Sequence, residues 1–274
     1  MNLNRINTVI DKEWTQAFAT LSSRIKLAIT PIFAGSALLI ALMMLNAPLL
    51  VKMGFLDAET AAKMADNPDF KAAMAGHVKF MMDFLLAFFM TLPAVSASQV
   101  AATGLTEDKK ARSLEPLLAT PLTTMELLAG KILAAILPAT MVGWFSYLVF
   151  ASLATYRGIG ASLTFGSLFG MSWMAAMLVI APLLAILVTV IAFFYSSRIP
   201  DTHRAEMACQ QAVGIIMVLP IIGISAIAIY AQAHEFAVMP ALMKFTLALL
   251  LINGFLIFLS VRLFQRENIL FKWK

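Results

Sequence analysis

Apolar stretches long enough to cross a lipid bilayer recur along this chain, and each is almost free of Asp, Glu, Lys and Arg. A membrane-spanning helix needs about 20 consecutive apolar residues. Hydrophobic residues make up 61% of the chain and charged residues only 13%, against about 25% charged residues in soluble domains. So few ionisable groups could not cover the surface of a soluble protein of this size. The sequence therefore predicts an all-α integral membrane protein.

The apolar stretches predict about six transmembrane helices. We place them near residues 27–51, 80–104, 132–156, 171–195, 212–230 and 241–263. The uncharged stretch between Arg157 and Arg198 is too long for one ordinary crossing, and its first third is rich in glycine. We therefore interpret residues 158–170 as a short interfacial or re-entrant element. The predicted organisation is an amino-terminal helix over residues 1–26 and a six-span transmembrane domain over residues 27–274.

Residues 1–26 have the pattern of an amphipathic helix. Apolar residues recur at steps of three and four, which is the period of one helix face; they are Ile6, Ile10, Trp14, Phe18, Leu21 and Ile25. Polar residues fall on the opposite face, namely Arg5, Asn7, Asp11, Lys12, Gln16 and Ser22. Such a helix can lie along a membrane surface in contact with lipids. The alternative is a helix that packs on other cytosolic protein, and the sequence leaves both open.

The distribution of Lys and Arg predicts the orientation of the chain, because cytoplasmic segments are enriched in both. If the amino end is cytoplasmic, most of the 20 Lys and Arg residues fall on the inner side. The four lysines of the outer segment 52–79 are offset there by acidic residues. We therefore predict a multi-pass protein of the cell (inner, cytoplasmic) membrane with both termini in the cytoplasm.

Several classes of partner are disfavoured by composition alone. The net charge of +5 is small and scattered, so we expect no nucleic acid to bind. The single cysteine, Cys209, can form neither an internal disulfide nor a cysteine-rich metal site. The 18 methionines are read as flexible packing residues rather than as ligands for an exported metal. We expect no metal site, no cofactor and no catalytic residue in the chain.

The charged segment between the second and third predicted spans, residues 105–131, has the signals of a short helix. Ser113 is suited to cap its amino end, and Pro116 is tolerated in a first turn. Three leucines, Leu114, Leu117 and Leu118, then share one apolar face. Thr120 precedes a proline and so disfavours further helix. This spacing is also compatible with an ordinary polar connector.

A second helix signal follows at once. Thr123 and Glu126 have the spacing of a capping box, in which the side chain of each residue bonds to the backbone N–H of the other. This pair predicts the start of the helix that forms the third span. The predicted short helix would then turn at the cytosolic surface between two membrane spans.

Two runs of sequence resemble one family. The run SLEPLLATPLTTMELLAGKIL at residues 113–133 resembles the cytosolic segment of the type-2 ABC exporter permeases, in which a T-L-E-x-L-L-x-T-P core is followed by E-L-L-x-G-K. The run SSRIPDTHRAEMACQQAVGIIMVLPII at residues 196–222 is similar to a second loop and span of the same family. Arg112 stands where the family commonly has glycine, Ser113 replaces threonine, and residues 203–206 look inserted, so the substrate stays open.

The resemblance implies a function for the short helix. In that family it couples the permease to a separate ATPase subunit. Carried over residue by residue, the implied docking element is Leu114, Glu115, Leu117, Leu118, Thr120 and Pro121, with Glu107, Lys109 and Arg112 as its charged surroundings. The resemblance also implies a second permease subunit, either identical or different, and transport by alternating access.

ATP binding by the chain itself is not expected. The chain has no G-x-x-x-x-G-K-[ST] phosphate loop, because Gly130 and Lys131 lack the upstream glycine and the following Ser or Thr. ATP hydrolysis would therefore reside on another polypeptide, and this chain would be a transport subunit rather than an enzyme.

Three alternatives remain. An ion-coupled secondary transporter would keep ionisable residues near mid-membrane, whereas here they cluster at span ends and Asp83 lies close to Lys79. An intramembrane protease would need a buried catalytic pair, but His77, His203 and His234 fall in loops. A non-transporting membrane scaffold is the third.

The main polar residues that could line a transport path are Ser96, Ser98 and Gln99 on the second predicted span and Gln210 and Gln211 near the start of the fifth. The alternative is that they form hydrogen bonds between helices, as polar groups in membranes do.

Overall fold

The computed structural model describes part of the chain. The described residues are 3–18, 57, 59, 66–69, 85–101, 123–156, 170–198, 204, 207–208, 211–215, 218, 222–223 and 238–263. Within these ranges the regular structure is helical, and no strand is present. The helices are α1 (Leu3–Ala17), an apolar helix over Leu85–Ala101, α7 (Thr124–Tyr156), α9 (Met171–Ala175), η1 (Ala176–Ile180), α10 (Ala181–Arg198) and α12 (Val238–Leu263).

Three of these helical segments are long and apolar enough to cross a membrane. They are Met125–Ser152, Met171–Phe194 and Leu242–Arg262, and they correspond to the predicted third, fourth and sixth spans. Part of the predicted second span is also helical, at Leu85–Ala101. The predicted first span and the element at residues 158–169 lie outside the described residues, and the fifth span is described only in short pieces. The prediction of an all-α membrane protein is confirmed.

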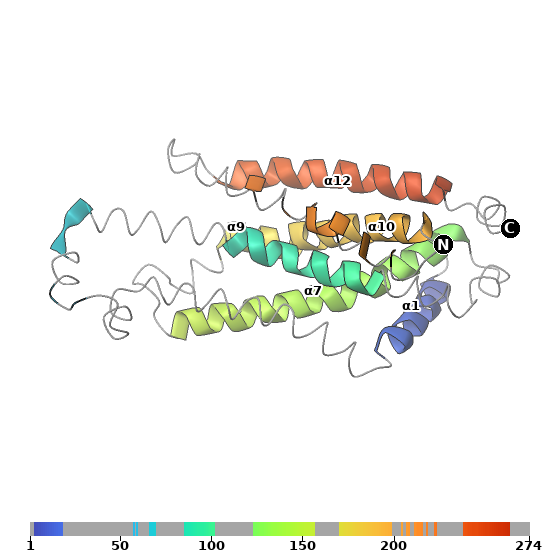
Figure 1. The fold of residues 1–274 in the computed structure, drawn as a ribbon, viewed down its shortest axis with the longest axis horizontal. Helices are drawn as coiled ribbons and strands as arrows, with labels where there is room; N and C mark the ends of the chain where they lie inside the picture. The colour runs from blue at the N-terminus through green and yellow to red at the C-terminus, as the bar shows by residue number, and fades with distance from the viewer. Residues whose placement is uncertain are drawn as a thin grey trace.

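The helices lie side by side, with α10 between α7 and α12 (Figure 1). The helix at Leu85–Ala101 and α10 form the centre of the group, and most of their side chains are buried. An aromatic cluster joins the first of these helices to α7: the Phe89 ring lies 5.7 Å from Tyr147 and 4.8 Å from Phe150, between centroids. Close backbone approach occurs at Gly143, where an added Cβ would lie 2.5 Å from Cγ of Pro93. A larger residue could not fit there.

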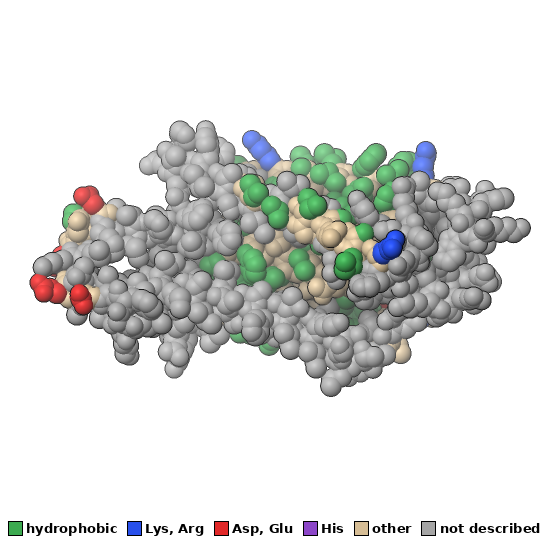
Figure 2. Space-filling view, in the orientation of Figure 1, with side chains coloured by type: hydrophobic (Ala, Val, Ile, Leu, Met, Phe, Trp, Pro, Cys, Tyr) green, Lys and Arg blue, Asp and Glu red, His purple; other side chains and the backbone are tan. Residues whose placement is uncertain are grey.

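α12 lies at the edge of the group. Its outer face exposes large apolar side chains, among them Met243, Leu247, Leu251 and Phe255. Figure 2 shows hydrophobic side chains spread over this face, with Lys and Arg side chains toward its edges. A soluble helix would place polar residues there, so the exposed apolar face is typical of a helix in contact with lipid.

One polar residue ties α12 to its neighbour. Nδ2 of Asn253, whose side chain is buried, donates to the Leu183 carbonyl oxygen at 3.1 Å and to the Leu249 carbonyl oxygen at 2.8 Å. Leu183 belongs to α10, and Leu249 precedes Asn253 by one turn of α12. Hydrogen bonds of this kind between helices contribute to packing where apolar burial gives no preference for protein over lipid.

Two segments with charged residues, α1 and the described pieces of residues 57–69, lie at different ends of the molecule. α1 packs against one end of the helix group, whereas the described pieces of residues 57–69 lie at the opposite end (Figure 1). These pieces carry exposed acidic side chains, at Asp57, Glu59, Asp66 and Asp69, and acidic side chains are visible at that end in Figure 2. The two segments that the Lys and Arg distribution assigns to opposite sides of the membrane are therefore at opposite ends of the fold.

Candidate functional site

The predicted docking residues lie in a segment that the structure does not describe. Residues 102–122 fall outside the described ranges. This segment contains the predicted docking element, Leu114, Glu115, Leu117, Leu118, Thr120 and Pro121, and its charged surroundings, Glu107, Lys109 and Arg112. The structure describes instead the helix into which this segment leads, α7, from the capping residue Thr123 onward.

α7 begins with the predicted capping box. The Thr123 backbone N–H donates to Oε2 of Glu126 at 3.1 Å, and the Glu126 backbone N–H donates to Oγ1 of Thr123 at 3.2 Å. These bonds satisfy two backbone donors that the first turn of a helix leaves without partners. The prediction from the Thr123–Glu126 spacing is confirmed, and the helix starts directly after the predicted docking element.

α1 packs on the first turns of α7 through a buried apolar stripe. Ile6 and Val9 are buried. Val9 lies over Gly130, where an added Cβ would come within 2.7 Å of the Val9 Cγ1 atom and 2.8 Å of its Cβ atom. Glycine at this position therefore permits the two helices to approach closely. α1 thus has α7 against Ile6 and Val9; the predicted contact of its apolar face with the membrane surface stays a prediction.

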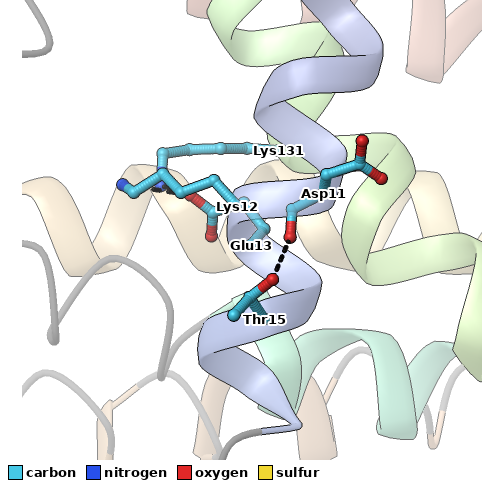
Figure 3. Close-up of polar contacts among 5 residues, drawn as sticks. All are labelled: Asp11, Lys12, Glu13, Thr15 and Lys131. Atoms are coloured by element: carbon cyan, nitrogen blue, oxygen red, sulfur yellow. Dashed lines mark hydrogen bonds and ion pairs between the residues drawn. The ribbon is translucent and has the colours of Figure 1, made fainter.

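Two ion pairs join the same two helices. Nζ of Lys131 lies 2.6 Å from Oε1 of Glu13, and both side chains are at most 10% exposed. Nη1 of Arg5 lies 3.8 Å from Oε2 of Glu126, the capping-box residue. Lys12 approaches Glu13 as well, with 3.7 Å between Nζ and Oε1. Figure 3 shows Glu13, Lys12 and Lys131 together, with Asp11 and Thr15 on the same helix.

A hydrogen bond completes this junction. Nε1 of Trp14 donates to the Ala134 carbonyl oxygen at 3.0 Å. Residue numbers increase together along the contacts of α1 with α7: Arg5 contacts Glu126, Val9 contacts Gly130, and Trp14 contacts Ala134. The two helix segments therefore run in the same direction. In the first ion pair α1 contributes the positive residue, Arg5, and in the second it contributes the negative residue, Glu13. A displacement of α1 along α7 by one or two helical turns would therefore bring like charges together.

The sequence pattern placed the buried face of α1 only approximately. Ile6, a predicted apolar-face residue, is buried, but Ile10, Trp14 and Phe18 are only partly buried. The apolar pattern does not include Glu13, although Glu13 follows Val9 by one helical turn and so continues the same stripe. In the same way, Lys131 appears in the sequence as the charged boundary of a span. Its acidic partner, 118 residues away, could not be identified from spacing.

Two of the residues considered for a transport path are buried in the described helix at Leu85–Ala101. Ser96 and Ser98 are buried, and Oγ of Ser98 donates to the Val95 carbonyl oxygen of its own helix at 2.7 Å. Gln99 is partly buried, Gln211 is exposed, and Gln210 lies outside the described residues. Ser98 is therefore satisfied within its own helix, whereas the sequence suggests either a transport path or a hydrogen bond to another helix. In the part of the chain that the structure describes, no cluster of three or more His, Cys, Asp or Glu residues could hold a metal ion.

The fold and the comparison with known families agree. Apolar helices of membrane-spanning length define a multi-pass α-helical membrane protein. Residues 8–264 match the family model described as ABC-2 family transporter protein. The chain therefore belongs to the ABC-2 transporter family, and it is a membrane-embedded permease of an ABC-type transporter. No curated protein and no solved structure matches the chain significantly.

Proposed function

We propose that this chain is the permease subunit of an ATP-driven exporter in the cell membrane, and that residues 107–121 dock a separate ATPase subunit. Membership of the ABC-2 transporter family over residues 8–264 carries the proposal, because proteins of this family generally work with an ATP-binding subunit. In this reading, two permease subunits, alike or different, form the pathway. ATP binding draws the docking segments together, and the spans reorient by alternating access.

The described structure supports a mechanical role for the segment that follows the docking element. α7 is continuous from Thr124 to Tyr156, so its first turn and its membrane-spanning part belong to one helix. The capping box fixes where this helix starts, and α1 holds its first turns through Glu13 and Lys131. A displacement of the docking element would therefore move the membrane-spanning part of α7 as well, because no flexible segment separates the first turn of α7 from it.

The separation of ATP hydrolysis from this chain also has structural support. Gly130 and Lys131 are the only Gly-Lys pair in the sequence, and both lie inside α7 against α1. Gly130 accommodates Val9, and Lys131 is paired with Glu13. Neither residue is available to hold a phosphate. The purified chain alone should neither bind nor hydrolyse ATP.

The docking proposal is tested by replacing the leucine pair. Burial of one leucine stabilises a complex by about 1.5–3 kcal/mol, so loss of two should weaken ATPase binding by tenfold or more. Leu117→Ser with Leu118→Ser should leave the permease inserted and folded, and should abolish ATPase co-purification and transport together. Leu183→Ala in α10 is the control, because it should affect packing without loss of the ATPase. Normal recruitment of the ATPase by a well-expressed double variant would show that these leucines are not the docking element.

A further inference from the structure

The fourth span contains a change of helix type between α9 and α10. Over η1, at Ala176–Ile180, the helix has π geometry, and the Ala181 backbone N–H donates to the Ala176 carbonyl oxygen five residues earlier. Pro182 follows immediately. A proline ring clashes with the carbonyl four residues before it in an α-helix, and a wider π turn relieves this crowding. Single π turns inside α-helices occur frequently at functional sites.

The π turn changes the hydrogen bonding of the Met177 carbonyl. In a regular α-helix the Ala181 N–H would donate to this oxygen, but here it donates to Ala176 instead. In continued π geometry residue 182 would be the donor, but proline has no backbone N–H. The Met177 carbonyl thus loses both backbone donors. Nε1 of Trp144, on α7, donates to it at 2.9 Å.

A second contact lies one turn away on both helices. The rings of Tyr147 on α7 and Trp173 on α9 are stacked, with their centroids 5.3 Å apart and an angle of 19° between their planes. Because Trp144 contacts Met177 and Tyr147 contacts Trp173, α7 and the fourth span are antiparallel. α7 therefore holds the π turn through Trp144 and the short helix before it through Tyr147.

We propose that Trp144 is a positioning residue that maintains the π register of the fourth span. Its indole takes the place of the backbone donor that Pro182 lacks. Without this bond the α register, in which the Ala181 N–H returns to the Met177 carbonyl, becomes the favoured one. That change of register rotates α9 about its axis relative to α10 and disrupts the stacking of Trp173 on Tyr147. The π turn is thus a point at which the fourth span can change register, and contacts with α7 hold it in the π register. This inference is independent of the docking segment.

A double-mutant cycle tests the pairing of Trp144 with Pro182. Trp144→Phe removes the indole donor and should lower the midpoint of thermal unfolding in detergent. Pro182→Ala supplies an N–H at residue 182, so the Met177 carbonyl has a backbone donor in either register. Trp144→Phe should therefore cause a clearly smaller decrease in the Pro182→Ala protein than in the wild type. An equal decrease in both backgrounds would overturn the proposal. If Trp144→Phe alone gives no folded protein, recovery of folded protein in the double variant supports it, and failure to recover contradicts it.

Labelling reports on the register itself. Met174, on α9, is 40% exposed, whereas its neighbour Trp173 is buried. In a chain with Cys209→Ser and Met174→Cys, a lipid-soluble maleimide should react with the new cysteine. Adding Trp144→Phe should lower that rate severalfold, because α9 turns its exposed face inward. Phe145→Leu, at a neighbouring exposed position of α7, should leave the rate unchanged. An unaltered rate in folded Trp144→Phe protein would show that the indole does not set the register.

Discussion

Glu13 and Lys131 form a buried ion pair between α1 and α7, with 2.6 Å between Oε1 and Nζ. The pair joins a helix at the amino end of the chain to the helix that leads out of the proposed docking segment. A charge removed from water needs its partner, because an isolated buried charge is strongly unfavourable. The pair therefore makes the position of α1 depend on α7, and the first prediction follows from it.

Removal of one member of the pair should destabilise the junction. Glu13→Gln or Lys131→Met breaks the buried ion pair, and loss of one member of such a pair costs about 3–5 kcal/mol. Replacement of both residues by methionine should cost much less, since no charge is then buried. The measurement is thermal unfolding in detergent, together with proteolytic cleavage of α1. Asp11→Asn, on the exposed side of α1, is the control. Equal stability of Glu13→Gln and wild type would contradict this account.

Gly130 should not tolerate a side chain. An alanine Cβ there would lie 2.7 Å from the Val9 Cγ1 atom, so Gly130→Ala should destabilise the protein by about 1–3 kcal/mol through overpacking. Val9→Ala should restore part of the loss by removing the clashing methyl groups. Gly254→Ala is the matched control, because no atom lies within 4 Å of the added Cβ. Similar unfolding midpoints for Gly130→Ala and Gly254→Ala would rule out close packing at Gly130.

The capping box should contribute measurably to the start of α7. Thr123→Ala removes the hydroxyl that accepts from the Glu126 N–H, and loss of such a cap costs about 1 kcal/mol. We expect faster amide hydrogen exchange in the first turn of α7, with the middle of the helix unchanged. Thr15→Ala in α1 removes only an exposed bond to the Asp11 carbonyl and should leave exchange in α7 as it was. Unchanged exchange in Thr123→Ala would show that the box does not stabilise this helix end.

Cysteine labelling tests the orientation. In a Cys209→Ser chain, a probe at Ala62 should react from outside the cell, whereas probes at Ala111 and Phe271 should react only after permeabilisation. The reason is the excess of Lys and Arg on the side assigned to the cytoplasm. The position of the described pieces of residues 57–69, opposite α1, agrees with this assignment (Figure 1). Reaction of Ala111→Cys from outside would reverse the predicted orientation.

The features that could be predicted from sequence depend on short spacings. Thr123 and Glu126 are three residues apart, and the capping box is found where they predict it. The fourth span begins at Met171, as predicted, because the glycine-rich first third of the uncharged stretch ends at Gly170. The sequence predicts a third span from Ile132 onward, because Lys131 is charged. The helix extends back to Thr124, and Lys131 is accommodated in it by Glu13.

The features that could not be predicted depend on partners far apart in the chain. The partner of Lys131 is 118 residues away, and the acceptor for Trp14 is 120 residues away. Pro182 indicates only that a regular helix is disturbed near it; the π turn that results also depends on a donor from α7. The docking residues Leu117 and Leu118 lie outside the described residues and stay a prediction.

The acceptors of three long-range hydrogen bonds have a consequence for variation among related sequences. Trp14, Trp144 and Asn253 each donate to a main-chain carbonyl, of Ala134, Met177 and Leu183 respectively. A main-chain oxygen is present whatever side chain the residue carries. In a saturation mutagenesis screen, the three donor positions should therefore accept few substitutions, whereas the acceptor positions should accept any residue of suitable volume. Each of these helix contacts would then depend on the identity of the donor residue alone, and the acceptor residue could vary in sequence.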